Sequence, residues 1–231
     1  MKNKITAQGP EGEKKQMKKV LPAVALALLV CCAPALAGRA EKLAALEQRI
    51  TSYTLNPEYK DDGYALAVVK GALESIREGS GGIGACLVDT SMGEIVEYGR
   101  NRQFSPYFRS DLHAEMDLLN KYEDRMKKSR EDPETGENPR DCKNLVLVTS
   151  VEPCPMCLTR IINSGIKTVL YVVEDREGGM ATRLDSLPPF WKEFAGDREF
   201  RLADCSAELR QIALDLFDFS SRSFAKNRVK K

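Results

Sequence analysis

Apolar residues follow two different spacings along the chain, and their alternation predicts the order of helices and strands. Residues three or four positions apart form one apolar face in each expected helix: 41–50, 63–78, 112–127, 155–163, 184–194 and 207–220. Short apolar runs bounded by turn residues predict strands at 83–88, 94–98, 145–148, 169–173 and 199–202. This order predicts an α/β fold with a five-stranded mixed sheet and helices on both faces.

The connections predict how neighbouring elements pair. Ser91-Met92-Gly93 between the first two strands is typical of an antiparallel hairpin. The helix at 155–163 ends at Gly165 and is linked closely to a strand on each side, which predicts a parallel pair joined by a crossover. Residues 128–143 are nearly all polar, and we expect them to form an exposed loop.

The first 37 residues have the pattern of a secretory signal peptide. Residues 20–37 carry no charge, two lysines precede them, and Ala35-Leu36-Ala37 has the small residues of a cleavage site. We therefore expect export, to the bacterial periplasm, after cleavage near Ala37, with Met17 as the start of translation. The alternative is an uncleaved membrane anchor, which two prolines within the apolar run disfavour.

Charge and composition limit what the rest of the chain can do. The whole chain has a net charge of +1, but residues 1–37 hold six lysines and two glutamates, so the mature chain would carry about −3. A net acidic body disfavours non-specific binding of nucleic acid, which needs clustered Lys and Arg. We expect a helical lead-in at 38–62, one main domain at 63–221 and a basic tail at 222–231, with no membrane span after residue 37.

Two motifs place metal-binding side chains at the starts of two expected helices. His113-Ala114-Glu115 opens one helix, with Asp111 as its expected N-cap, and Pro153-Cys154-Pro155-Met156-Cys157 opens another, with Pro155 at its first position. Side chains in a first turn point toward the amino-terminal end of the helix, so an imidazole and two thiolates could meet. Such a set leaves tetrahedral Zn²⁺ one open position for water. The expected ligands are His113, Cys154 and Cys157.

These motifs resemble the signature of the zinc-dependent cytidine deaminase-like superfamily, H-x-E followed by P-C-x-x-C. The resemblance covers about residues 63–220 and is greatest to the branch of bacterial tRNA adenosine deaminases and guanine deaminases. It implies a three-layer α/β/α fold, one Zn²⁺ per chain and a homodimer. We expect the apolar run 187–191 in the core or at a dimer contact. The chain departs from that branch in its longer 128–143 loop and in its secretory signal.

The resemblance also implies roles for residues at the two motifs. Glu115 would move a proton from water to the substrate and then to the leaving ammonia. The Ala114 N–H would bind a carbonyl of the base, and Asn101, twelve residues before His113, would contact the ring. The expected substrate is a free nucleobase or nucleoside, guanine or an adenine compound before cytosine or cytidine. A tRNA-specific adenosine deaminase is the alternative, although an exported enzyme would not meet cytosolic tRNA.

Other interpretations use the same cysteines. A C-x-x-C pair before a helix also suits an exported redox protein, but His-Ala-Glu would have no role there. A closed structural zinc site with Cys86 or Cys142 as fourth ligand would leave Glu115 without a function. Cys86, Cys142 and Cys205 remain after export and zinc binding, so at most one disulfide can form within a chain.

Overall fold

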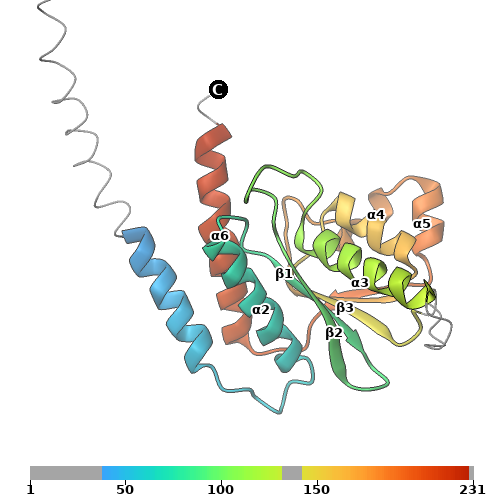
Figure 1. Cartoon of the computed structure of the whole chain (residues 1–231), viewed down its shortest axis with the longest axis horizontal. Helices are drawn as coiled ribbons and strands as arrows, with labels where there is room; N and C mark the ends of the chain where they lie inside the picture. The colour runs from blue at the N-terminus through green and yellow to red at the C-terminus, as the bar shows by residue number, and fades with distance from the viewer. Residues whose placement is uncertain (1–37, 132–141, 229–231) are drawn as a thin grey trace, which may run out of the picture. The chain divides into compact units, whose positions relative to one another are not determined.

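The computed structural model describes residues 38–131 and 142–228 (Figure 1). The chain divides into two units, Met1–Ala45 and Leu46–Lys231. The described part of the first unit, residues 38–45, is helical, and the second unit begins with helical residues 46–52. The expected signal peptide therefore lies outside the described residues. No helix in the described ranges has the length and hydropathy that a bilayer span needs.

The second unit contains alternating helices and strands that follow the predicted order. In chain order they are α2 (Asp62–Arg77), β1 (Gly84–Asp89), β2 (Glu94–Arg100), α3 (Ala114–Glu131), β3 (Leu145–Val151), α4 (Pro155–Ser164), β4 (Thr168–Val173), the 3₁₀ helix η2 (Ala181–Ser186), α5 (Pro189–Ala195), β5 (Glu199–Leu202) and α6 (Ala207–Arg228). The strands form one sheet in the order β2-β1-β3-β4-β5. β1 pairs antiparallel with β2 and β3, whereas β3-β4 and β4-β5 are parallel. The expected five-stranded mixed sheet, hairpin and crossover are confirmed.

The helices cover both faces of this sheet. α2 and α6 pack together on one face, and α3 and α4 pack on the other (Figure 1). β1 is buried on both faces, so its side chains alternate between the two layers of core. The three-layer α/β/α arrangement is therefore confirmed.

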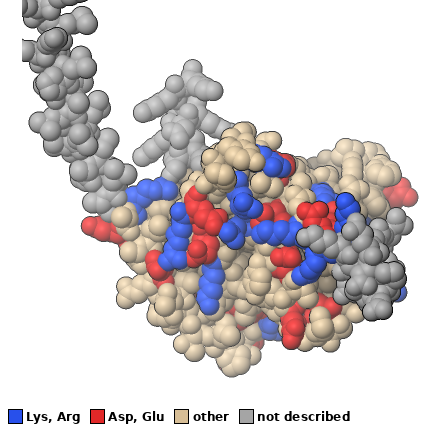
Figure 2. Space-filling view, viewed as in Figure 1, with Lys and Arg blue, Asp and Glu red and all other residues tan. Residues whose placement is uncertain are grey.

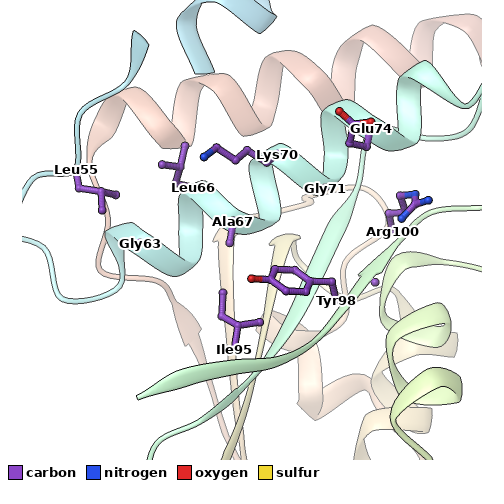
Figure 3. A pocket seen from close by; sticks show the side chains of 11 residues that line it. Leu55, Gly63, Leu66, Ala67, Lys70, Gly71, Glu74, Ile95, Tyr98 and Arg100 are labelled. Carbon is purple, nitrogen blue, oxygen red and sulfur yellow. The ribbon is translucent and has the colours of Figure 1, made fainter. Parts of the chain in front are cut away.

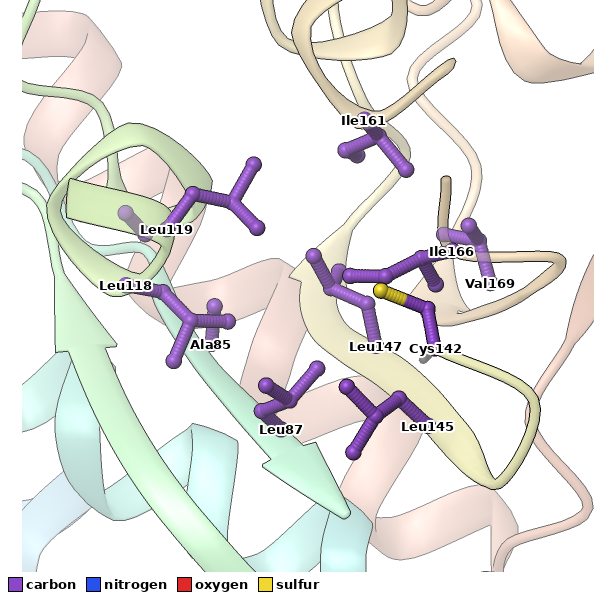
Figure 4. Packing of buried hydrophobic residues seen from close by; sticks show 11 residues of the cluster. Ala85, Leu87, Leu118, Leu119, Cys142, Leu145, Leu147, Ile161, Ile166 and Val169 are labelled. Carbon is purple, nitrogen blue, oxygen red and sulfur yellow. The ribbon is translucent and has the colours of Figure 1, made fainter. Parts of the chain in front are cut away.

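The core between the sheet and helices α3 and α4 is aliphatic (Figure 4). Leu118 and Leu119 of α3 pack with Leu87 of β1 and Leu147 of β3, and all four are at most 1% exposed. Each such side chain contributes about 2 kcal/mol by leaving water. The remaining members come from the same layers or the links between them: Ala85, Ala114, Cys142, Leu145, Ile161, Ile166 and Val169. This packing fixes α3 and α4 against the sheet.

The structure differs from the expected helix at 184–194. That segment is divided into η2 and α5, because Pro188 and Pro189 lack the N–H donors that a continuous helix needs. Pro189 instead begins α5, where the missing donor costs nothing. Within the run 187–191, expected in the core or at a dimer contact, Leu187 and Trp191 pack against a core cluster, whereas Phe190 is 66% exposed in the single chain.

The ends of two other elements lie beyond their predicted positions. α3 continues through residues 128–131, which belonged to the expected loop, and residues 132–141 lie outside the described part. α6 continues through residues 222–228, so these residues of the expected basic tail are helical.

Most of the expected lead-in at 38–62 is not separate from the main domain, because residues 46–62 belong to the same unit. Leu46 and Ile50 are buried in that unit at 7% and 3% exposure.

Candidate active site

His113, Cys154 and Cys157 lie together, with their ligand atoms within 4.8 Å of one another. Nδ1 of His113 is 3.6 Å from Sγ of Cys154. A tetrahedral zinc ion with usual bond lengths separates a nitrogen ligand from a sulfur ligand by about 3.6 Å. The donor set and its spacing therefore fit one Zn²⁺ ion, and the expected ligands are brought together as the sequence predicts.

The topology of the sheet explains why two distant motifs meet. β2 and β3 both pair antiparallel with β1, so they run in the same direction. Their carboxyl ends lie at the same edge of the sheet, about 10 Å apart, because one strand separates them. The chain leaves these ends to begin α3 and α4, which lie on the same face and contact each other. The amino-terminal ends of both helices are therefore neighbours.

The two helix starts are built differently. Cys154 is the N-cap of α4 and Pro155 occupies its first turn, as the sequence predicts. The expected N-cap role of Asp111 is wrong, since α3 begins at Ala114 and the carbonyl of His113 accepts the first bond, from the Asp117 N–H at 2.9 Å. Asp111 instead forms a bidentate pair with Arg109, at 2.8 and 2.6 Å. His113 is therefore the last residue before the helix.

Glu115 is a buried carboxyl group beside the three ligands. It lies in the first turn of α3 and is 3% exposed. Burial and the nearby charge of Cys154 raise the pKa of Glu115, although a hydrogen bond with the Cys157 side chain opposes this. A carboxyl group with a raised pKa is suited to both accepting and releasing a proton near neutral pH.

The side chains of the three expected ligands shift one another's pKa values even without a metal ion. The hydrogen bond from Cys157, with a further contribution from His113, lowers the pKa of Cys154 to about 4. The same bond and burial raise the pKa of Cys157, and the bond with Cys154 raises the pKa of His113. These shifts favour the thiolate at Cys154 and the protonated thiol at Cys157, and metal binding would release the proton of Cys157.

Asn101 lies outside the three-ligand cluster, at the end of β2. It is 3% exposed, and its Oδ1 accepts hydrogen bonds from the N–H groups of Gly81 at 3.3 Å and Gln103 at 3.0 Å. Ser75 Oγ donates to the Asn101 carbonyl at 2.5 Å. The side-chain oxygen is thus occupied by two backbone donors, and the amide nitrogen is the group that could meet a ligand. Ala114, the other expected substrate contact, is fully buried.

Asp117 is a buried residue near the site that the sequence analysis missed. It is 4% exposed, accepts the N–H of Arg100 at 3.2 Å and pairs with Lys121 at 2.6 Å. These contacts fasten the end of β2 to α3. The available signal was an acid with a lysine four positions later, a common surface pair in helices. The spacing of Asp117 and Lys121 does not indicate that Asp117 is buried.

The remaining cysteines do not join the metal cluster. Cys86 and Cys142 are buried, and neither belongs to the ligand group. Cys142 donates to the Ser164 carbonyl at 3.4 Å. None of the five cysteines in the described ranges, Cys205 included, forms a disulfide. A closed structural site with Cys86 or Cys142 as fourth ligand is therefore not formed.

A groove of about 520 Å³ lies elsewhere, between α2 and β2 (Figure 3). A bulge at Val96, where the β1–β2 register shifts, turns both Ile95 and Tyr98 toward α2, where they face Ala67. Gly71 and Gly99 bring the helix and strand close at one side. None of the three metal ligands lines this groove, so it is separate from the candidate active site.

Comparison with known proteins identifies the family. The model of the cytidine and deoxycytidylate deaminase zinc-binding region matches residues 59–173, a range that includes both motifs. Residues 59–173 therefore belong to a deaminase domain of the cytidine deaminase-like superfamily. A search of curated proteins found no match.

Similar solved structures include deaminases of two substrate classes. A guanine deaminase from Nitrosomonas europaea is 19% identical, over 73% of this chain and 86% of that one, with a TM-score of 0.48. A tRNA:A34 deaminase that carries out A-to-I editing is 21% identical, over 59% and 93%, with a TM-score of 0.43. A guanine deaminase from Bacillus subtilis is 30% identical, over 52% and 66%, with a TM-score of 0.37. The family assignment rests on the family model.

Proposed function

We propose that this protein is a zinc-dependent hydrolytic deaminase of a free nucleobase or nucleoside, with guanine or an adenine compound preferred to cytosine or cytidine. The observation that carries the proposal is the position of Glu115, a buried carboxyl group with a raised pKa beside three zinc-type ligands. A structural zinc site or a redox pair of cysteines has no use for such a group. Hydrolytic deamination needs it as an acid and base.

The reaction replaces an exocyclic C–NH₂ group and one water by C=O and ammonia. His113, Cys154 and Cys157 would hold the ion, which when bound supplies Lewis-acid activation of a water nucleophile. Glu115 accepts a proton from the water and delivers it to a ring nitrogen of the substrate. Glu115 then takes the proton of the hydroxyl group that the water has added to the substrate and transfers it to the departing amine, so that the C–N bond breaks and the C=O bond forms. Burial of Glu115 favours both transfers, because a carboxyl group with a raised pKa can hold each proton between accepting it and delivering it.

Two donors would recognise the heterocycle. The Oδ1 of Asn101 is occupied by two backbone N–H groups, so Asn101 would offer its NH₂ group to an acceptor of the ring. Ala114 is the first residue of α3, and the N–H groups of a first turn have no acceptor within the helix. Its N–H can therefore donate to a carbonyl or ring nitrogen. Both donors suit a base that presents acceptors on its edge, as purines do.

Surface charge supports a small substrate over a nucleic acid. On the face shown in Figure 2, Lys and Arg alternate with Asp and Glu instead of forming a patch of one sign. Several cations of the described chain form ion pairs, as in Arg77–Glu74, Arg100–Glu78 and Lys121–Asp117. Paired cations contribute little to phosphate binding. Export after cleavage near Ala37 forms part of the proposal, because an exported enzyme meets free bases and nucleosides.

Ammonia release tests the proposed function. The purified zinc-loaded protein is incubated with guanine, adenine, cytosine and their nucleosides, and compared with Glu115→Gln. We expect release from a purine compound and a fall of about 10²–10⁴-fold in the variant, because proton transfer is lost. Zinc content, measured in parallel, should not change. Glu174→Gln, which alters an exposed carboxyl group, is the matched control.

Two outcomes would count against the proposal. Equal rates for Glu115→Gln and the parent would remove Glu115 from the reaction. No release from any of the six compounds, with one zinc bound per chain, would exclude the proposed substrates. In that case inosine formation in a tRNA transcript would test the tRNA adenosine deaminase alternative.

A further inference from the structure

Glu152 is a buried carboxylate immediately before the motif that begins at Pro153 and carries Cys154 and Cys157. It is 3% exposed and follows β3 directly. It forms no ion pair with any described side chain, and its two oxygens are instead surrounded by hydrogen-bond donors. A buried charge without a cation is costly unless such donors compensate for it. This arrangement therefore requires an explanation, and the proposed reaction does not supply one.

All three donors come from the segment that follows β4. The N–H of Asp175 donates to Oε2 at 3.0 Å, and the N–H and hydroxyl of Thr182 donate to Oε1 at 2.8 and 2.9 Å. The segment is folded tightly around the carboxylate. A Cβ on Gly179 would lie 2.5 Å from Oε2, so only glycine fits there. Glu152 thus lies at the centre of residues 175–182.

The same segment is bonded to the backbone that carries Cys154. The N–H of Met180 donates to the Pro153 carbonyl at 2.9 Å, and just before the segment the Val173 carbonyl at the end of β4 accepts the N–H of Glu152 at 2.8 Å. Cys154 lies between Pro153 and Pro155, whose rings fix their own φ angles. A displacement of residues 175–182 would therefore be transmitted through this stiff segment to the cysteine.

We propose that Glu152 is a positioning residue for zinc binding: it holds residues 175–182 against the Cys154 segment and so fixes the Cys154 sulfur relative to His113. The inference rests on the proposed zinc site but not on the identity of the substrate. Metal ligands need placement to within about 0.5 Å. Groups that orient ligands from behind typically change metal affinity by about 10–100-fold when they are altered.

The chemistry of the pocket selects a carboxylate over an amide. Both oxygens of Glu152 accept N–H groups from the backbone. Glutamine would place an NH₂ group against one of these donors, leaving two donors facing each other and one bond lost. Glu152→Gln therefore preserves size and shape while it disturbs the contact with Asp175 or Thr182.

Zinc affinity measured without substrate tests the proposal. The full-length protein competes with a chromogenic chelator for zinc, and unfolding is followed by circular dichroism. We expect Glu152→Gln to bind zinc about 10–100-fold more weakly than the parent. We expect faster hydrogen exchange at the amides of Asp175 and Thr182. Glu174→Gln makes the same chemical change at an exposed position of the neighbouring backbone and should bind zinc as the parent does.

A second variant decides the matter if Glu152→Gln does not fold. Thr182→Val keeps the side-chain shape and the N–H bond but removes the hydroxyl donor, and we expect several-fold weaker zinc binding. A folded Glu152→Gln with the zinc affinity of Glu174→Gln would overturn the proposal, as would unchanged affinity in Thr182→Val. If the parent protein binds zinc but releases no ammonia, only the proposed deaminase function is contradicted. If the parent protein binds no zinc, both the deaminase function and the positioning role of Glu152 are contradicted.

Discussion

Individual buried carboxylates in this protein are stabilised by backbone N–H groups and hydroxyls. Asp62 accepts the N–H groups of Asn56 and Ser206, each at 2.9 Å, and the hydroxyl of Tyr53 at 2.7 Å. Burial alone would raise the pKa of Asp62, but these bonds together lower it below its ordinary value of 3.8. Burial raises the pKa of Tyr53 to about 12, so its hydroxyl keeps its proton. Asp62 thereby joins the residues before α2 to the start of α6.

Asp62→Asn should reduce stability in a manner that depends on pH. At pH 7 we expect a loss of about 1–3 kcal/mol, because an amide cannot accept from donors on both sides. The contribution of Asp62 is complete above its ordinary pKa of 3.8 and is lost as pH falls through the lower folded-state pKa. Urea unfolding at pH 7 and below pH 4 should show the difference between parent and variant becoming smaller.

Asp185→Asn is the control for that comparison. The side chain of Asp185 is 90% exposed and pairs only with Lys192 among the described residues. We expect no measurable change in stability at either pH. A difference between parent and Asp62→Asn that stays constant as the solution is acidified would show that the ionised carboxylate is not the stabilising form.

At the scale of elements, the position of α3 depends on a glycine in the adjacent strand. A Cβ on Gly99 of β2 would collide with the Ala114 carbonyl and would lie 2.6–2.7 Å from atoms of Leu118. Backbone atoms of α3 therefore occupy the space that a side chain would need. This close approach sets where α3 begins, and so where His113 and Glu115 lie.

Gly99→Ala should destabilise the fold and weaken zinc binding together. Overpacking of this kind costs about 1–3 kcal/mol, and relief by movement of α3 would displace His113. Gly63→Ala is the matched control, since no atom lies within 4 Å of a Cβ at Gly63 in α2. That change should stabilise the helix by up to about 1 kcal/mol. Denaturant unfolding and chelator competition measure both effects, and equal behaviour of the two variants would contradict the close-approach argument.

The outer edge of β2 is covered by the same helix. Lys121 and Arg125 of α3 donate to the carbonyls of Tyr98 at 3.1 Å and Val96 at 2.6 Å. The N–H of Arg100 donates to Asp117. An edge strand with unpaired backbone groups invites pairing with another chain. Side chains of α3 satisfy these groups here, so α3 both supplies the site and protects the edge of the sheet.

At the scale of the whole molecule, the candidate zinc site joins two parts of the chain. His113 follows the β1–β2 hairpin, whereas Cys154 and Cys157 belong to the β3-α4-β4 crossover. An ion bound to all three would therefore crosslink the antiparallel and parallel halves of the sheet. Ligands that bind only the folded state stabilise it in proportion to the logarithm of their concentration over the dissociation constant.

Zinc removal should therefore lower the melting temperature. With free zinc at about a thousandfold excess over its dissociation constant, the stabilisation is about 4 kcal/mol, which for a chain of this size is on the order of 10 °C. Calorimetry with and without a chelator measures the shift. The shift should disappear in Cys157→Ser and persist in Cys142→Ser, a buried thiol outside the cluster. Loss of the shift in both variants would point to general damage of the core.

Local patterns of the sequence determined the elements and the ligands. Apolar spacing predicted each strand of the sheet, because alternation and helical periodicity are properties of neighbouring residues. Gly165, with φ of 88°, ends α4 as expected. His113, Cys154 and Cys157 could be predicted as candidate zinc ligands because zinc chemistry restricts the residue types and their spacing within each motif. The prediction of one helix over 184–194 was wrong, because the apolar spacing continues across Pro188 and Pro189, where the structure divides the segment into η2 and α5.

Tertiary structure alone decided which distant groups became neighbours. The direction of β2 relative to β3 brings the two motifs together, and that direction follows from both strands pairing with β1. Burial of Glu115, the donors around Glu152 and the approach of α3 to Gly99 all depend on contacts between residues far apart in the chain. Sequence periodicity carries no information on such distances. The residues of the site are therefore fixed locally, whereas their geometry and pKa values are set by the packing of the sheet and its helices.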